Sequence, residues 1–142
     1  MYIAILVAST FIQISGAPLT TAVNSICLPY TAADGKLETS EAAVRAAGFT
    51  YSGSGANTRD YGNGEVSLSI GTYDGKRYCY LQVPRDASAQ LTPLLQSAAK
   101  ARGLTLDPDY DLGKRWKGAA GQISFSVEDD DGAFTSVSFK GG

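Results

Sequence analysis

The chain has 142 residues and a formal net charge of −2, which corresponds to one domain of nearly neutral charge. It contains no histidine, and this excludes imidazole metal ligands and the Ser–His and Cys–His nucleophile pairs. Its 12 basic and 14 acidic residues lack the basic excess that is typical of nucleic-acid-binding domains. We therefore expect a single globular domain that does not bind nucleic acid.

The first 33 residues carry no charged side chain, and residues 2–14 form a short, largely apolar run. This length is typical of the apolar region of an export signal and is short for a membrane span. Cleavage after Gly16 or Ala22 fits the small residues that follow. Because no Lys or Arg precedes the run, an uncleaved membrane anchor and a first core element remain alternatives. We predict an export signal over residues 1–22, a domain over residues 23–142 and a periplasmic or secreted protein.

Cys27 and Cys79 are the two cysteines of the chain. In an oxidising compartment such a pair is expected to form a disulfide. The bond would close a loop of about 50 residues and stabilise the fold by about 3–4 kcal/mol in the chain-entropy model. Two buried free thiols are the alternative. A redox pair is disfavoured, because such pairs normally occupy a Cys-x-x-Cys motif.

The first expected elements are helical. Residues 23–30 place apolar side chains on one helical face, although Pro29 interrupts this short segment. Residues 37–48 predict a longer helix, and Gly48 suits the position just after its end. Residues 50–64 are rich in Ser, Gly, Asn and Asp and predict a loop.

Residues 65–83 predict a β-hairpin around the dipeptide Asp74-Gly75. Asp-Gly favours a type I′ turn, in which both central residues have a positive φ angle. This turn fixes a register that gathers the apolar residues on one face, with Ile70 opposite Cys79. The other face then receives a mostly polar set: Ser67, Ser69, Gly71, Tyr78, Tyr80 and Gln82.

Residues 86–103 predict another helix. Its regular part should begin with Thr92 as the cap, because Pro93 is tolerated in the first turn of a helix but not in its interior. Residues 105–121 predict a second polar loop.

Residues 122–140 predict a second hairpin. A three-residue loop over residues 130–132 keeps its apolar side chains on one face, with Ile123 opposite Phe139.

The order of helix, polar loop and hairpin thus occurs twice, over about residues 37–84 and 86–140. This predicts an α+β fold built from a tandem α-β-β repeat. Two such units most simply form a four-stranded antiparallel sheet with the helices packed on one face. The other face would be open and would carry Tyr78, Tyr80 and Phe134.

The chain combines a cysteine before the first helix, the helix end Ala47-Gly48-Phe49 and a second cysteine in a strand. With the export signal, this layout resembles small exported bacterial proteins of uncharacterised function. The resemblance covers most of the chain and implies no activity.

Two acidic segments are candidates for cation binding. Residues 107–113 alternate carboxylates as calcium loops do, but Leu112 and Gly118 occupy the EF-hand positions for glycine and glutamate. A solvated loop is the alternative. Residues 128–131 are acidic as well, and their composition is typical of a hairpin tip. We predict no metal and no cofactor.

Two surfaces are candidates for binding a partner. Arg115, Trp116 and Lys117 form a basic-aromatic cluster, and Trp and Arg are over-represented at binding hot spots. Alternatively, Trp116 covers one end of the core while its basic neighbours are solvated. The open face offers tyrosines, which provide contact area at a low entropic cost. Its alternative is a face that simply remains in water.

These observations predict a small exported binding module, inhibitor-like or envelope-associated, which is not an enzyme. Its partner would be another protein, bound through the open face or through residues 105–121. One alternative is a hydrolase of envelope glycan that uses a pair of carboxylates, for example two of Asp107, Asp109 and Asp111, or Asp60 with Glu65. Another is an assembly subunit that pairs through sheet edges.

Overall fold

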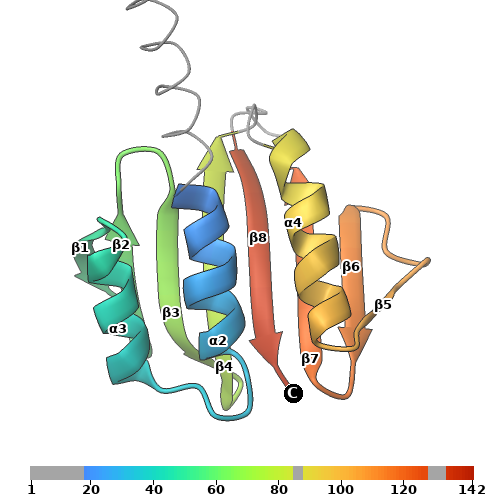
Figure 1. Ribbon diagram of the computed structural model, residues 1–142, viewed down its shortest axis with the longest axis horizontal. Helices are drawn as coiled ribbons and strands as arrows, with labels where there is room; N and C mark the ends of the chain where they lie inside the picture. The colour runs from blue at the N-terminus through green and yellow to red at the C-terminus, as the bar shows by residue number, and fades with distance from the viewer. Residues whose placement is uncertain (1–17, 85–87, 128–133) are drawn as a thin grey trace, which may run out of the picture.

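The computed structural model describes residues 18–84, 88–127 and 134–142. Its centre is a single antiparallel sheet of eight strands, which Figure 1 shows face on. The strands are β1 (Thr50–Ser54), β2 (Thr58–Gly62), β3 (Ser67–Tyr73), β4 (Lys76–Pro84), β5 (Thr105–Leu106), β6 (Gly113–Gly118), β7 (Gly121–Val127) and β8 (Phe134–Gly141). They lie in the order β1-β2-β3-β4-β8-β7-β6-β5, so β4 and β8 pair at the centre.

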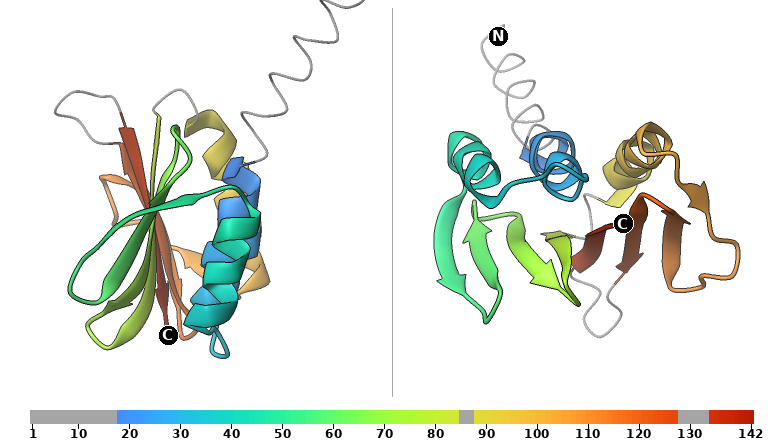
Figure 2. Two further views of the ribbon diagram at one scale, coloured as in Figure 1. Left: turned by 90° about the vertical axis from the view of Figure 1, so that its left-hand side faces the viewer. Right: turned by 90° about the horizontal axis from the view of Figure 1, so that it is seen from below.

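The helical elements are η1 (Ala22–Cys27), α2 (Leu28–Tyr30), α3 (Leu37–Ala46) and α4 (Ser88–Ala101). The view from below in Figure 2 shows all of them on one side of the sheet. Gly48, with a φ angle of 88°, follows α3 as predicted. The predicted start of α4 is wrong, because the helix begins at Ser88 and contains Pro93 in its interior.

The predicted four-stranded sheet is wrong, and so is the α-β-β unit on which it was based. The segments 50–64 and 105–121, predicted as loops, form β1 with β2 and β5 with β6. They extend the two central hairpins on their outer sides. The sequences of these strands show no alternation of apolar and polar residues. Their buried aromatic residues are Tyr61 in β2 and Trp116 in β6, one in each strand. With eight strands and few short helices, the molecule is mostly sheet.

The predicted registers of both hairpins are confirmed. Asp74 and Gly75 have φ angles of 56° and 74°, as a type I′ turn requires, and Ile70 pairs with Cys79. In the second hairpin Ile123 pairs with Phe139. The loop predicted over residues 130–132 lies outside the described residues.

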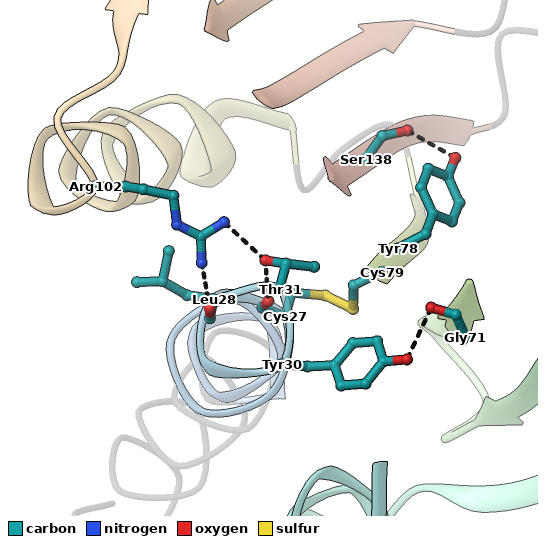
Figure 3. Close-up of a disulfide and its surroundings, with 9 residues drawn as sticks. All are labelled: Cys27, Leu28, Tyr30, Thr31, Gly71, Tyr78, Cys79, Arg102 and Ser138. Carbon is teal, nitrogen blue, oxygen red and sulfur yellow. Dashed lines mark hydrogen bonds between the residues drawn. A yellow bond between two sulfur atoms is a disulfide. The ribbon is translucent and has the colours of Figure 1, made fainter. Parts of the chain in front are cut away.

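The core lies between the sheet and the helices, and the disulfide of Cys27 with Cys79 crosses it from η1 to β4 (Figure 3). The predicted pairing is therefore confirmed, and a disulfide is consistent with an oxidising compartment. Nearby, the hydroxyl of Tyr30 donates to the carbonyl oxygen of Gly71 over 2.8 Å. Gly71 has no room for a side chain, because a Cβ atom there would lie 2.0 Å from the carbonyl oxygen of Asn57.

The beginning of the described chain belongs to this core. Residues 18–21 are helical and continue into η1, and Leu19 and Ala22 are buried. Both residues fall within the segment predicted as an export signal. None of the helices in the described residues combines the length and the apolar character that crossing a bilayer requires.

Candidate functional site

The candidate site is the face of the sheet that is turned away from the helices, called the open face below. In the described ranges no helix covers this face (Figure 2). The strand register assigns its residues, because alternate side chains of a strand point to opposite faces. The central strands contribute mainly Ser, Tyr and Gln: Ser67, Ser69, Tyr73, Tyr78, Tyr80, Gln82, Gln122, Ser124, Ser126, Ser136 and Ser138.

A row of three aromatic rings runs along the middle of the open face. It consists of Tyr73, Tyr78 and Tyr80, called the tyrosine row below. The ring centroids of Tyr73 and Tyr78 are 5.8 Å apart, and those of Tyr78 and Tyr80 are 6.3 Å apart with nearly parallel planes. Such spacings are typical of interacting aromatic pairs.

Two of the three hydroxyl groups of the tyrosine row form hydrogen bonds to the neighbouring strand β8. The oxygen of Tyr78 lies 3.1 Å from Oγ of Ser138, and that of Tyr80 lies 2.8 Å from Oγ of Ser136. These hydrogen bonds restrict the rings before any partner arrives. A partner would therefore meet aromatic surface that has already lost much of its rotational freedom.

The open face is basic although the whole chain is acidic. Among the described strands, its charged side chains are four basic residues and one acidic residue: Lys76, Arg115, Lys117, Lys140 and Asp60. The net charge of the complete chain is −2. Lys140 lies over the tyrosine row, with its Nζ atom 5.7 Å from the ring centre of Tyr73. The acidic Asp60 accepts a hydrogen bond of 2.6 Å from Ser69.

A second cluster occupies the end of the open face near β5 and β6. The guanidinium of Arg115 lies 4.0 Å above the ring of Tyr110, and Lys117 forms an ion pair of 3.3 Å with Asp107. The pKa of Asp107 is lowered, first by the hydrogen bond from the backbone N–H of Asp109 and then by Lys117. This carboxyl is therefore held as an anion, whereas a general acid needs a raised pKa.

Trp116 lies on the opposite side of the sheet from its predicted companions. It has 6% exposure and packs in the core, whereas Arg115 and Lys117 point to the open face. The structure therefore does not bring the three residues of this predicted cluster together. Successive side chains of β6 point to opposite faces of the sheet, so Trp116 is separated from its neighbours. A segment predicted as a loop carries no such assignment of faces.

Tyr78, Tyr80 and Phe134 all lie on the open face, as predicted from the register. Phe134 is 44% exposed and pairs with Pro84 at the end of β4. Sequence reasoning did not single out Tyr73 or Lys140 as site residues. The hairpin register already placed Tyr73 opposite Lys76, but it could not show that the neighbour of Tyr78 across the central pair would be Lys140.

Comparison with protein-family models, curated proteins and solved structures finds no match for this chain. In the described part of the chain, no group of three or more Cys, Asp or Glu side chains is placed to hold a metal ion. The acidic segment 128–131 lies outside the described residues. A function is therefore inferred from the geometry and the charge of the open face.

Proposed function

We propose that this protein is a small exported binding module, and that its open face binds the acidic surface of another protein. The observation that carries this proposal is the tyrosine row at the centre of an uncovered sheet, in which the rings of Tyr78 and Tyr80 are stacked and their hydroxyls are hydrogen-bonded to β8. Tyrosine is favoured at protein interfaces, because its ring supplies a large contact area and its hydroxyl remains able to bond.

The charge of the open face selects the partner. Lys76 and Lys140 flank the tyrosine row, and no carboxylate of the described residues forms an ion pair with either of them. An acidic protein surface would complement these cations and would be steered toward them. Neutral Ser, Tyr and Gln side chains separate the basic residues, and this favours a protein over a nucleic acid, whose usual binding surface is a clustered basic patch or stripe.

The proposal is tested by capture from the periplasmic extract and culture fluid of the producing organism, after nuclease treatment. The disulfide-bonded chain serves as bait, and each captured protein is purified and titrated against it. We expect an acidic protein whose dissociation constant rises at least about tenfold with Tyr78→Ala/Tyr80→Ala, the loss expected for hot-spot aromatics. We expect a similar rise with Lys76→Glu/Lys140→Glu.

Lys114→Glu is the matched control. Lys114 is exposed on β6 but lies on the helix side of the sheet, so its charge reversal should leave the affinity unchanged. Thermal unfolding of each variant confirms that the fold is retained. The proposal would be overturned if Lys114→Glu weakened the affinity for the partner as much as the double variants do, or if both double variants kept that affinity. It would also be overturned if nuclease treatment abolished the capture. Self-association through the open face, detected by sedimentation-velocity measurement of the chain alone, would replace the proposed acidic partner with a second copy of this chain.

A further inference from the structure

A cavity of about 610 Å³ lies at the end of the molecule that carries residue 142, on the helix side of the sheet. It is formed where the end of α2, the end of α4 and the start of β4 meet. Its apolar lining includes Leu28, Pro29, Ala33 and Ala101, the charged side chains among its described lining are those of Arg77 and Arg102, and Gly142 lies beside them. A volume of this size suits a small-molecule ligand.

Both arginines are held in place by neutral groups. As Figure 3 shows, Arg102 reaches from the end of α4 to α2, where Nη1 donates to Oγ1 of Thr31 over 2.8 Å and Nη2 donates to the carbonyl oxygen of Leu28. Nη2 of Arg77 donates to the carbonyl oxygen of Ala32 over 2.6 Å. The neighbouring disulfide of Cys27 with Cys79 fixes η1, which continues directly into α2, against β4, so the two guanidinium groups are positioned in advance.

The charges of these arginines are not neutralised within the described residues. The ion pairs found there join Glu41 to Arg45 and Arg59, and Asp107 to Lys117. Among the described residues no Asp or Glu side chain lines the cavity, and Nε of Arg77 is buried without a hydrogen-bond acceptor. Burial lowers the pKa of Arg102 by desolvation, which shows that its charge lies in a poorly hydrated place. Two partly desolvated cations at one cavity favour binding of an anion.

We propose that this cavity binds a small organic anion with a carboxylate head and an apolar body. The guanidinium fork matches the two oxygens of a carboxylate. Three of the guanidinium N–H groups donate to protein oxygens, and the remaining N–H groups of both arginines are left to bind an anion. The alanines, Leu28 and Pro29 would contact the apolar body. This site lies on the opposite side of the sheet from the open face and does not depend on the proposed function.

The test is calorimetric titration of the disulfide-bonded chain with octanoate. Titrations with octanol, octyl phosphate and inorganic phosphate run beside it. We expect octanoate to bind, octanol and inorganic phosphate not to bind, and octyl phosphate to bind more weakly than octanoate. Any affinity tag belongs at the N-terminal side, because Gly142 lines the cavity. Absence of octanoate binding at millimolar concentration, or equal binding of octanol, would overturn the proposal. Tighter binding of either phosphate would overturn the choice of a carboxylate.

Two variants locate the site. Arg77→Gln removes one cation and should weaken octanoate about tenfold or more, the loss expected when a hydrogen bond to a charged group is removed. Ala33→Trp fills the cavity from an exposed position while keeping both arginines in the chain, and should abolish binding even if Arg77→Gln fails to fold. Arg45→Gln on the exposed surface of α3 is the matched control and should bind normally. Unchanged binding by Ala33→Trp, or an equal loss with Arg45→Gln, would place the ligand elsewhere.

Discussion

The hydroxyl oxygen of Tyr80 lies 2.8 Å from Oγ of Ser136 on the neighbouring strand. The two residues are diagonal neighbours across the pair of β4 with β8, which joins the two halves of the sheet. One hydrogen bond thus links the central strands and orients a ring of the tyrosine row. The same contact contributes to the fold and prepares the surface that we propose for binding.

Tyr80→Phe should therefore lower the free energy of unfolding by about 1 kcal/mol, the usual net contribution of one hydrogen bond. Urea unfolding monitored by circular dichroism measures this change. Tyr73→Phe is the control, because the side chain of Tyr73 is 63% exposed and its hydroxyl should contribute little. If both substitutions cost the same free energy, the bond between Tyr80 and Ser136 is not a specific stabilising contact.

Trp116→Ala should destabilise the protein strongly without acting on the open face. The indole is buried in the core, and replacing a buried Trp by Ala typically costs about 3–5 kcal/mol. Chemical denaturation gives the loss, and capture of the partner is measured under conditions in which the variant is folded. Loss of the partner with an unchanged melting temperature would instead make Trp116 a direct contact.

The central hairpins were predictable because two local signals agreed. The Asp74-Gly75 turn sets the register of the first hairpin. The apolar alternation of its two strands agrees with this register, which places Ile70 opposite Cys79. The outer strands gave no such agreement. In β2 and β6, Tyr61 and Trp116 are each the single buried aromatic residue among polar neighbours, so neither strand shows a repeating pattern. These strands exist because they extend an existing sheet, which is a tertiary effect.

The candidate site was predictable only in part. Tyr78 and Tyr80 follow from the hairpin register, but the pairing of β4 with β8 that supplies Ser136 and Ser138 is a long-range contact. The cavity arginines were missed entirely. One signal existed, since the register puts Arg77 on the core side two residues before Cys79, an unusual place for a charge.

The contacts of the Glu41 carboxylate predict that the protein loses stability in acid. Its carboxylate accepts hydrogen bonds from Tyr61 over 2.9 Å and from Arg59 over 2.8 Å, and these contacts lower its pKa. The stabilisation is complete above the ordinary glutamate pKa of about 4.3 and is lost as the pH falls through the lower pKa of the folded state.

Glu41→Gln should therefore be less stable than the native protein at neutral pH, and the difference should shrink in acid. Urea unfolding between neutral and acidic pH provides the comparison, with Glu38→Gln on the exposed surface of α3 as the control. A difference between Glu41→Gln and the native protein that stays constant across this range would show that the carboxylate contributes no pH-dependent stability.

The buried N-terminal residues distinguish the two predicted cleavage sites of the export signal. Processing after Ala22 would remove Leu19 and Ala22, and losing the Leu19 side chain alone corresponds to about 2–5 kcal/mol. We therefore expect cleavage after Gly16, which lies outside the described residues. The intact mass of the protein recovered from the periplasm or the culture fluid reports the site directly, and a mature chain that begins at Val23 would contradict this expectation.

The most direct test of the open face is hydroxyl-radical footprinting of the complex with the captured partner, read by mass spectrometry. Tyr73 lies on the open face with 63% exposure, and Tyr51 pairs with Tyr61 on the helix side with 54% exposure, so the two tyrosines are matched in accessibility. We predict that the partner reduces oxidation of Tyr73 and leaves oxidation of Tyr51 unchanged. Protection of Tyr51 without protection of Tyr73 would contradict binding through the open face.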